Sequence, residues 1–394
     1  MRRRARLLRT GAEPGPSGWR NAVVQTLALS ARHCPVMARW VVIWAHGSVP
    51  EAGAQLWTGA ALVALLKPSG GVRPIALGEA MLKFAEVCIL DMASARIRRL
   101  LEPHQVGRRT PGGAEAAIEA LRAVASGSGM AVLQLDLKNA YGQISRDEML
   151  EAPRSDAPEL ARCAAAQWRG PVHAWTRDGQ GWRHFETERG GWQGSALMQT
   201  AFAIALTWRL RATLPQGRDA VHAPPEDQVF PDGGPEVEQD CGRPGIGVHG
   251  WVAYADDTHV VGTPVQLERS MSLLCDSLPH GGHVLQLAKC HVWCPCPREL
   301  DEDNAAALQR LHDVVAAAPD GLVVLGGGFG GEDYALTPDM AAPMHKRVDR
   351  ALAIARAAVL LARADTDTPV LQVSWLLAGN LGGSPTAGFR RPHR

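Results

Sequence analysis

Two adjacent acids between two apolar segments place the strongest constraint on the fold of this chain. The segment GVHGWVAY at 247–254 precedes Asp256 and Asp257, and THVVG follows them. Apolar segments on both sides of a short polar turn are typical of a β-hairpin. The sequence therefore predicts a hairpin that carries two neighbouring carboxylates at its tip.

A third acid ends a short apolar run earlier in the chain. Residues 131–136, AVLQLD, have the length and composition of a buried strand with Asp136 at its C-terminal end. Ser145 and Glu148 have the S-x-x-E spacing of a capping box, which predicts a helix beginning at Ser145. Asp136 is thus expected in a turn between a strand and a helix.

Other segments have patterns that predict further elements. Residues 67–77, KPSGGVRPIAL, favour two short strands joined by a Ser-Gly-Gly turn, with Lys67 and Arg73 on a projecting hairpin. Helices are predicted around 112–126 and over 194–214, and the second is apolar on nearly all sides, as in a helix packed between layers.

Three more predictions concern the second half of the chain. Residues 219–245 are acidic and rich in proline, so a mobile loop is expected there. Thr263 and Pro264 begin a helix, which places Lys289 on the strand that follows it. The tail from Ser384 is expected to be unstructured.

Composition limits the class of protein. A chain of 394 residues with 46% hydrophobic and 21% charged residues and a mean hydropathy of -0.10 is globular, which excludes a disulfide miniprotein and a disordered or fibrous chain. Its eight cysteines lack the spacing of a secreted scaffold, and no apolar stretch of about 18 residues is present to span a membrane. We therefore expect a reducing, intracellular setting without membrane insertion.

Charge and residue usage bear on partners. Seven acids and no Lys or Arg lie in 219–240, so the rest of the chain carries +8 although the total is +1. A partner made of phosphates is compatible with that charge. Only five lysines and three tyrosines occur, which makes each remaining Lys or Tyr mildly informative.

The acids indicate a function more strongly as a set than singly. Each alone is more often a cap or a solvated turn, but here a strand-end acid, a Gln-Gly before a buried helix, an Asp-Asp hairpin and a lone Lys follow one another. Two metal ions about 3.5–4 Å apart need carboxylates from different strands to clamp the oxygens of a phosphoryl transfer. Asp136 and Asp256 on neighbouring strands would supply them.

From Lys67 to Gly331 the sequence resembles the reverse transcriptases of retrotransposons that lack long terminal repeats, and more loosely those of group II introns. Six segments carry the resemblance, in the family's order: VRPIAL, QLDLKNAYGQI, GGWQGSAL, VAYADD, LQLAKC and VVLGGGFG. A YADD tetrapeptide alone is weak evidence. Six motifs in order are much more specific.

The resemblance implies an α+β fold of the right-hand polymerase type, with an antiparallel palm sheet packed on helices, fingers and a partial thumb. It divides the chain into an N-terminal extension of unknown role (1–66), fingers and palm (67–335, including the 219–245 insert), and a thumb-like helix with a disordered tail (336–394). The implied activity is RNA-directed DNA polymerisation in the nucleus. The implied partners are an RNA template, a DNA primer or target, deoxynucleoside triphosphates, and other retroelement domains on a longer chain.

The family pattern also assigns a metal site. Asp136, the Leu137 carbonyl and Asp256 would hold two Mg²⁺ ions, or Mn²⁺ in their place, and Asp257 would support the metals or the primer end. Positioning and charge neutralisation make up nearly all of the catalytic task in phosphoryl transfer. Lys289 would donate a proton to the departing pyrophosphate, which Arg cannot do because its pKa is too high. A plain surface lysine is the alternative interpretation.

Nucleotide contacts are implied at further positions. Lys67 and Arg73 would contact the triphosphate, the alternative being a solvated hairpin. Tyr141, five residues after Asp136, would exclude a 2′-hydroxyl, the alternative being a residue that merely packs the turn. Gln193 and Gly194 would belong to the nucleotide site as the start of the family's second palm motif.

Several hypotheses stay open from the sequence. After Gln193 the chain has Ser195, Ala196 and then Met198-Gln199, where the family writes an acid or small residue, a proline and a Ser-Pro. This departure favours the runner-up hypothesis, an RNA-binding scaffold with impaired catalysis. An RNA polymerase is disfavoured by Tyr141. The cluster Cys290, His291, Cys294, Cys296 lacks paired C-x2-C spacing, so core or strand cysteines are favoured over zinc.

Overall fold

The computed structural model describes residues 1–66, 70, 72–108, 110, 112–125, 127, 129–178, 180–214, 250–325 and 327–330. Packing divides the chain into two compact units, Met1–Pro319 and Asp320–Arg394. In the second, β10 (Gly321–Val324) and β11 (Gly327–Gly330) form an antiparallel hairpin. The predicted loop at 219–245 and the thumb-like segment and tail of 336–394 lie outside the described residues.

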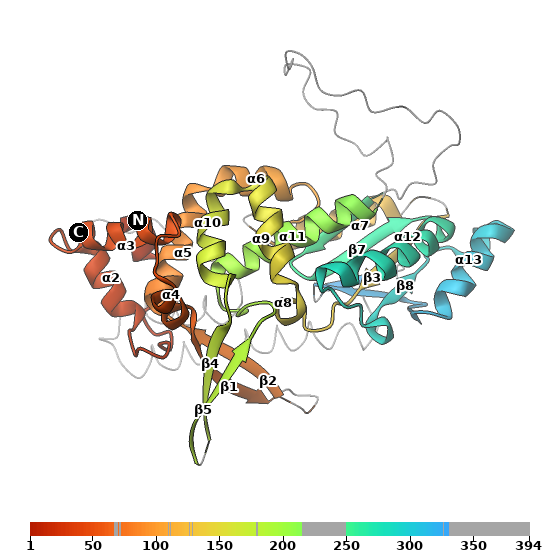
Figure 1. The fold of residues 1–394 in the computed structure, drawn as a ribbon. Coiled ribbons are helices and arrows are strands. Elements are labelled where there is room, and N and C mark those ends of the chain that lie inside the picture. Colours follow the sequence, from red (N-terminus) through yellow and green to blue (C-terminus); the bar gives the residue numbers. More distant parts are fainter. Residues whose placement is uncertain are drawn as a thin grey trace, which may run out of the picture. The chain divides into compact units, whose positions relative to one another are not determined.

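A five-stranded sheet contains both acid-bearing segments (Figure 1). Its order is β6-β7-β3-β8-β9, and all neighbours are antiparallel except β8 and β9, so the predicted purely antiparallel sheet is corrected at that edge. The predicted hairpin around Asp256 and the strand before Asp136 are confirmed. The strands are β3 (Ala131–Leu135), β6 (Gly250–Tyr254), β7 (Asp257–Gly262), β8 (His291–Trp293) and β9 (Ala316–Ala317).

Helices pack on this sheet and on one another. The predicted helix at 194–214 is confirmed as α11, and buried residues line most of its circumference, as expected for a helix between layers. α12 begins after Thr263, whose hydroxyl forms a capping box with Gln266. The helices from this part of the chain are α7 (Gly113–Ala125), α8 (Ala140–Gln143), α9 (Arg146–Asp156), α10 (Pro158–Trp168), α11 (Ala196–Thr213), α12 (Pro264–Ser277) and α13 (Glu302–His312).

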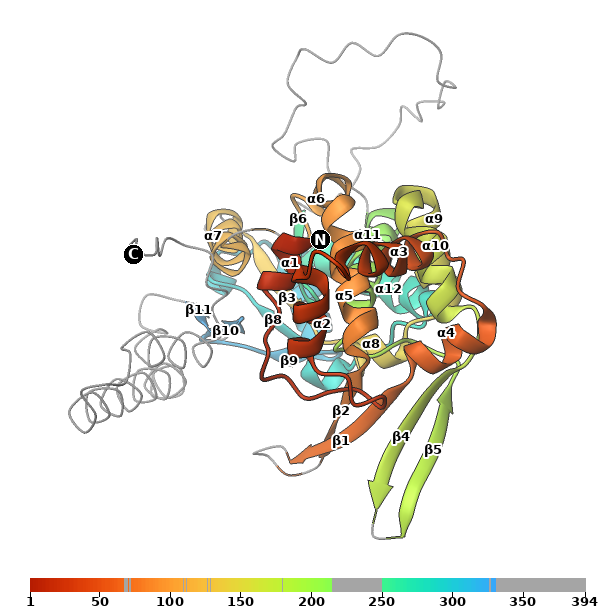
Figure 2. The ribbon, with the colours of Figure 1, turned by 90° about the vertical axis from the view of Figure 1, so that its left-hand side faces the viewer.

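A second, four-stranded sheet has the order β2-β1-β4-β5, with β1 and β4 parallel and the other neighbours antiparallel (Figures 1 and 2). The second strand predicted within 67–77 is confirmed as β2, which pairs antiparallel with β1. The described first strand is the apolar run AALVALL at 60–66, and residues 67–69 lie outside the described part of the chain. The strands are β1 (Ala60–Leu66), β2 (Val72–Gly78), β4 (Val172–Asp178) and β5 (Gly181–Thr187).

The first 66 residues belong to the same compact unit as both sheets. The N-terminal helices pack against α5, and Trp44 of α3 is fully buried. Packing therefore continues across the expected boundary at residue 66. These helices are α1 (Arg2–Arg6), α2 (Asn21–Leu29), α3 (Cys34–Ala45), α4 (Glu51–Thr58), α5 (Ala80–Met92) and α6 (Ser94–Leu101). None of the described helices is both long and apolar enough to cross a membrane.

The helix predicted at Ser145 is confirmed as α9, but the predicted capping box was wrong. Ser145 makes no side-chain capping bond. Glu148 is instead buried and accepts hydrogen bonds from Arg209 Nε (3.2 Å) and Nη2 (2.5 Å) of α11, with His283 Nε2 at 3.4 Å. A buried carboxylate needs such partners because burying a charge without one is costly.

Glu148→Gln removes the charge between α9 and α11 while keeping the size of the side chain. Burial alone raises the pKa of Glu148, but hydrogen bonds from His283 and Arg209 outweigh it and hold the pKa below its ordinary value. The charge thus contributes stability above the unfolded pKa, and the contribution is lost as pH falls through the folded pKa. We expect a loss of about 2 kcal/mol in the free energy of unfolding at pH 7, measured with urea.

The pH series and a control on the same helix test the cause. Below about pH 4 the difference between wild type and Glu148→Gln should shrink, since the wild-type carboxyl is then becoming neutral. Glu151→Gln removes an exposed acid that pairs with Arg154 at 3.2 Å, and should change stability by less than about 0.5 kcal/mol. Equal losses for the two variants would contradict the assignment.

Candidate functional site: three carboxylates at one end of the five-stranded sheet

Strand register brings the three acids together. Leu135 of β3 pairs with Thr258 of β7, and continuing the register by one residue sets Asp136 opposite Asp257. Asp256 lies in the turn that joins β6 to β7. Opposite residues on neighbouring strands lie about 4.5–5.5 Å apart at Cα, so all three carboxylates occur at one end of the sheet, as predicted.

Burial and neighbouring charge act on two of these acids. Partial burial and the charge of Asp136 raise the pKa of Asp256 above its ordinary value. Partial burial and the charges of Asp256 and Asp136 raise the pKa of Asp257 to about 6, although its side chain is still exposed. Both shifts have the sign of like charges that repel in a partly desolvated place. A divalent cation bound there would relieve this repulsion.

The carbonyl of Leu137 is directed by the segment that pairs with the end of β3. Leu137 faces Leu285 in an antiparallel bridge. Two backbone hydrogen bonds flank this pair, Lys138 to Val284 at 2.8 Å and Gln286 to Asp136 at 2.9 Å. The pair between them is of the non-hydrogen-bonded kind, so the Leu137 carbonyl points to the other side of the strand, where β7 begins.

Gln105 holds the Asp-Asp turn, a role that no sequence pattern indicated. The segment at 104–107 runs beside β6, and the Gln105 side chain is fully buried. Its Nε2 donates to the Ala255 carbonyl (2.9 Å), and its Oε1 accepts from the N–H groups of Ala255 (2.7 Å) and Gly107 (3.2 Å). Ala255 has a φ of 61°, a conformation that residues with a Cβ adopt only when their surroundings impose it.

Tyr141 lies on α8 in the same electrostatic neighbourhood. Its ring packs on Phe202 with centroids 4.6 Å apart. Burial, with the charges of Asp256 and Asp257, raises the pKa of its hydroxyl well above the ordinary value. Behind it, Gly190 has a φ of +55° and lies so close that a Cβ would sit 2.2 Å from the Tyr141 carbonyl oxygen. Gly190 is thus required for the backbone to pass α8.

Arg108 connects this neighbourhood to the start of α11, and its role was likewise not predicted from the sequence. It donates from Nη1 to Gln199 Oε1 (2.7 Å) and from Nη2 to the Ala196 carbonyl and Thr200 Oγ1 (both 3.1 Å). Gln199 Nε2 donates in turn to the Gln193 carbonyl (2.9 Å). Burial lowers the pKa of Arg108, while Tyr141 and Tyr254 act in the opposite direction.

Gln193 and Gly194 are exposed and immediately precede α11. A Cβ on Gly194 would lie 3.1 Å from the Ala76 carbonyl of β2, so this segment meets the four-stranded sheet. The buried Glu86 binds the N-terminus of α11 through Ser195 Oγ (2.8 Å) and the Ala196 N–H (2.9 Å). Burial raises the pKa of Glu86 despite these bonds.

One further lysine lies close to this segment. Lys83 Nζ is 4.0 Å from where a Gly194 Cβ would stand, and burial lowers the pKa of this amine. Its rarity as one of five lysines was the sequence signal that could have singled it out.

The structure links the other predicted cations, Lys67, Arg73 and Lys289, to the three acids less directly. Lys67 and the side chain of Arg73 lie outside the described residues, although the backbone of Arg73 pairs with Leu65 in the β1–β2 ladder. Lys289 was expected on a strand, but it ends a 3₁₀ turn at Leu287–Lys289 before β8 and is exposed. The turn begins after Gln286, whose N–H binds the Asp136 carbonyl, so Lys289 lies on a segment attached to the acidic site.

The cysteines near Lys289 have structural contacts, as favoured from the sequence. Cys290 is buried, and its Sγ accepts from the Asp136 N–H at 3.4 Å. Cys294 Sγ donates to the Met130 carbonyl at 3.6 Å. Burial raises the pKa of both thiols, which opposes the thiolate form that zinc requires.

Three potential metal-ligand atoms lie closer together on the β4–β5 hairpin than the three acids do at the end of the five-stranded sheet. Within the described residues, His173, His184 and Glu186 are the one set of three potential ligands whose donor atoms all lie within 4.8 Å of one another. The three acids of the candidate site are therefore more widely spaced. A pair of ions about 3.5–4 Å apart allows that spacing, because each carboxylate need not reach the same point.

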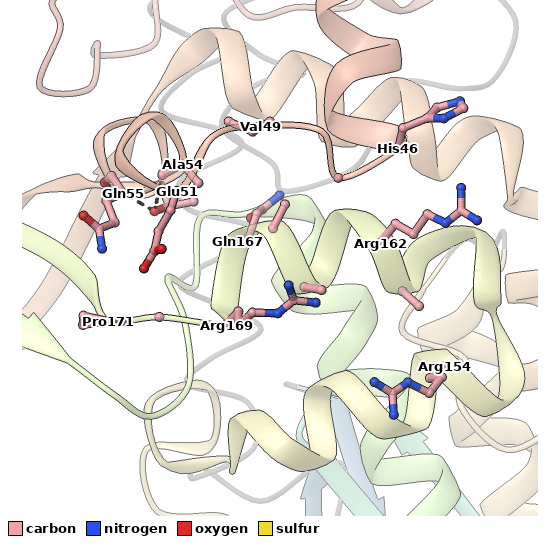
Figure 3. A pocket seen from close by; sticks show the side chains of 16 residues that line it. His46, Val49, Glu51, Ala54, Gln55, Arg154, Arg162, Gln167, Arg169 and Pro171 are labelled. Carbon is pink, nitrogen blue, oxygen red and sulfur yellow. Dashed lines mark hydrogen bonds between the residues drawn. The ribbon is translucent and has the colours of Figure 1, made fainter.

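A cavity between α4, α9 and α10 is a separate feature. It has a volume of about 610 Å³ and is lined by Arg154, Arg162 and Arg169 from α9, α10 and the residue after it, and by Glu51 and Gln55 from α4 (Figure 3). None of its lining residues belongs to the three acids or to their supporting contacts. Its arginines suit an anion, not a metal ion.

The chain was compared with family models and with curated proteins, and neither comparison gave a match. What the site can do must therefore be inferred from its own residues.

Gln105→Ala should loosen the turn that carries Asp256 and Asp257. The change removes three hydrogen bonds and leaves the polar groups of Ala255 and Gly107 without them. We expect the free energy of unfolding to fall by about 2–3 kcal/mol in urea titrations, with faster amide hydrogen exchange over 251–259.

Gln309→Ala is the matched control, since Gln309 is exposed on α13. It should change stability by less than about 0.5 kcal/mol and leave exchange at 251–259 unaltered. A Gln105 variant that behaved like this control would show that the turn is held by other contacts.

Proposed function

We propose that the chain is an RNA-directed DNA polymerase that extends a DNA primer on an RNA template with deoxynucleoside triphosphates. In this proposal the five-stranded sheet is the palm and the four-stranded sheet belongs to the fingers. One observation carries it: Asp136 lies opposite the turn with Asp256 and Asp257, and Tyr141 lies in their electrostatic neighbourhood. The resemblance of the six motifs supports the same assignment.

The donor set fits Mg²⁺. Carboxylate and carbonyl oxygens are the ligands that this hard cation prefers, and Asp136, Asp256, Asp257 and the Leu137 carbonyl offer only oxygen. Burial and then the neighbouring acids raise the pKa values of Asp256 and Asp257, and a bound cation would favour their ionised forms. When bound, two Mg²⁺ ions, or Mn²⁺ in their place, would neutralise phosphate charge and favour ionisation of the primer hydroxyl.

The chain's own residues would divide the remaining tasks. Gln105 is a positioning residue that orients the Asp-Asp turn. Tyr141 would lie under the sugar of the incoming nucleotide, and Gln193 and Gly194 would border it at the start of α11. Lys289 would hold the proton for pyrophosphate, and Lys67 and Arg73 would contact the triphosphate. The exposed position of Lys289 suits contact with a soluble ligand.

Asp256→Asn should abolish primer extension while leaving the protein folded, because it removes one ligand charge at nearly constant size. We expect incorporation of dTTP on poly(rA) with an oligo(dT) primer and Mg²⁺ to fall at least about 1,000-fold, which corresponds to about 4 kcal/mol of transition-state stabilisation. Urea titration should show equal or higher stability, since a repelling charge is lost.

Asp276→Asn is the control, because Asp276 is exposed in the last turn of α12. It should extend primers like wild type. Full activity of Asp256→Asn would contradict the site. A wild-type protein that binds the template–primer but does not extend it would favour the alternative, a polymerase-fold RNA-binding scaffold.

Tyr141→Ala tests DNA synthesis against RNA synthesis. If the ring fills the space that a 2′-hydroxyl needs, removing it should raise the use of UTP relative to dTTP by about tenfold or more, equivalent to about 1.4 kcal/mol. The measurement is kcat/KM for each nucleotide on the same template–primer.

Tyr141→Phe keeps the ring and should keep the discrimination of wild type. Tyr141 also packs on Phe202, so the folded fraction of both variants should be checked by urea titration. An unchanged ratio in an active Tyr141→Ala enzyme would remove Tyr141 from the nucleotide site.

A further inference from the structure

A compact group of nitrogen and oxygen donors lies on the β4–β5 hairpin, which extends away from the helices (Figure 1). His173 pairs directly with Glu186 across the two strands, and the next pair on the same face is Trp175 with His184. Alternation along each strand directs these four side chains to one face of the hairpin. The register of β4 and β5 thus collects the group.

The distances suit one small cation. His173 Nδ1 lies 2.9 Å from His184 Nε2 and 3.6 Å from Glu186 Oε1, and all three donor atoms lie within 4.8 Å of one another. Zinc bonds of about 2.0–2.1 Å in a tetrahedron separate donor atoms by roughly 3.3 Å. Small side-chain adjustments would therefore bring the three donors to bonding distance.

The surroundings restrict the two imidazoles before any ion binds. The rings of His173 and His184 are stacked with centroids 5.0 Å apart, and Trp175 packs within 5.6 Å of the His184 ring and 6.1 Å of the His173 ring. The His173 side chain is only 17% exposed, whereas that of Glu186 is 55% exposed. An ion can thus reach these donor atoms from solvent, and ring packing already restricts the two imidazoles.

We propose that His173, His184 and Glu186 form a binding site for a divalent transition-metal ion, with Zn²⁺ as the best match. Two imidazoles and one carboxylate are a donor set found at zinc sites with an open fourth position. Imidazole nitrogen disfavours Mg²⁺, so this site differs in ligand chemistry from the oxygen-only acidic site. The ion would link β4 to β5 and hold the hairpin together, and the proposal does not depend on polymerase activity.

Zinc titration of the full-length protein tests the site. Isothermal calorimetry with Zn²⁺, in excess Mg²⁺ to occupy the acidic site, should show one site that weakens at least about tenfold in His184→Ala and in His173→Ala. His280→Ala is the matched control, since His280 is exposed on a 3₁₀ turn away from the hairpin, and it should bind like wild type.

Hydrogen exchange localises the effect. Zn²⁺ should slow amide exchange over 172–187 in wild type and in His280→Ala, and not in His184→Ala, because the ion joins the two strands. No Zn²⁺ binding by wild type, or equal affinity and protection in His184→Ala, would overturn the proposal and leave only a stacked imidazole pair. Loss of primer extension would not bear on it, and intact zinc binding would not rescue the polymerase assignment.

Discussion

Three carboxylates at one end of a sheet repel one another, and the candidate site depends on how the backbone holds them there. The turn with Asp256 and Asp257 is fixed by the buried side chain of Gln105, which binds the Ala255 peptide groups on both sides. Asp136 is fixed through its own backbone, by the Gln286 N–H and by the thiol of Cys290. These contacts are made to peptide groups and not to the carboxylates, so the carboxylates are left to bind a ligand. Burial, followed by repulsion from neighbouring acids, raises the pKa values of Asp256 and Asp257 in this arrangement.

The N-terminus of α11 connects the two sheets. Glu86 of α5 binds the first turn of this helix, where the partial positive charge of a helix end stabilises an anion. Gly194 lies against the β2 backbone, and Arg108 reaches the same turn from the segment that supports the Asp-Asp hairpin. The start of α11 thus contacts both the four-stranded sheet and the segment that supports the Asp-Asp turn. The contact with β2 gives the small size of Gly194 a physical reason, since a Cβ would crowd the Ala76 carbonyl at 3.1 Å.

Local sequence patterns predicted the elements that carry the acids. Features that depend on pairing between distant parts of the chain could not be predicted in this way. The strand before Asp136 and the hairpin at Asp256 were predictable because apolar runs that end in acids are short and contiguous. The described first strand of the other sheet lies at 60–66, before the predicted segment, where it pairs with β2 along its length and with β4, more than 100 residues away, at Ala60 and Ala61. Ser145 and Glu148 matched a capping box in spacing alone, and Arg209 and His283 bind Glu148 instead. Gln105 had no local signal, since its partner is 150 residues away.

The residues after Gln193, where the sequence departs from the motif that it resembles, make specific contacts at the start of α11. Gln199 bonds at once to Arg108 and to the Gln193 carbonyl, at 2.7 and 2.9 Å, which a proline could not do because it has neither an amide side chain nor an N–H. Ser195 caps the helix through the Met198 N–H at 3.0 Å. Through Gln199 and Arg108, the start of α11 is linked to the segment whose Gln105 supports the Asp-Asp turn. A proline at position 199 would remove the side-chain half of this link.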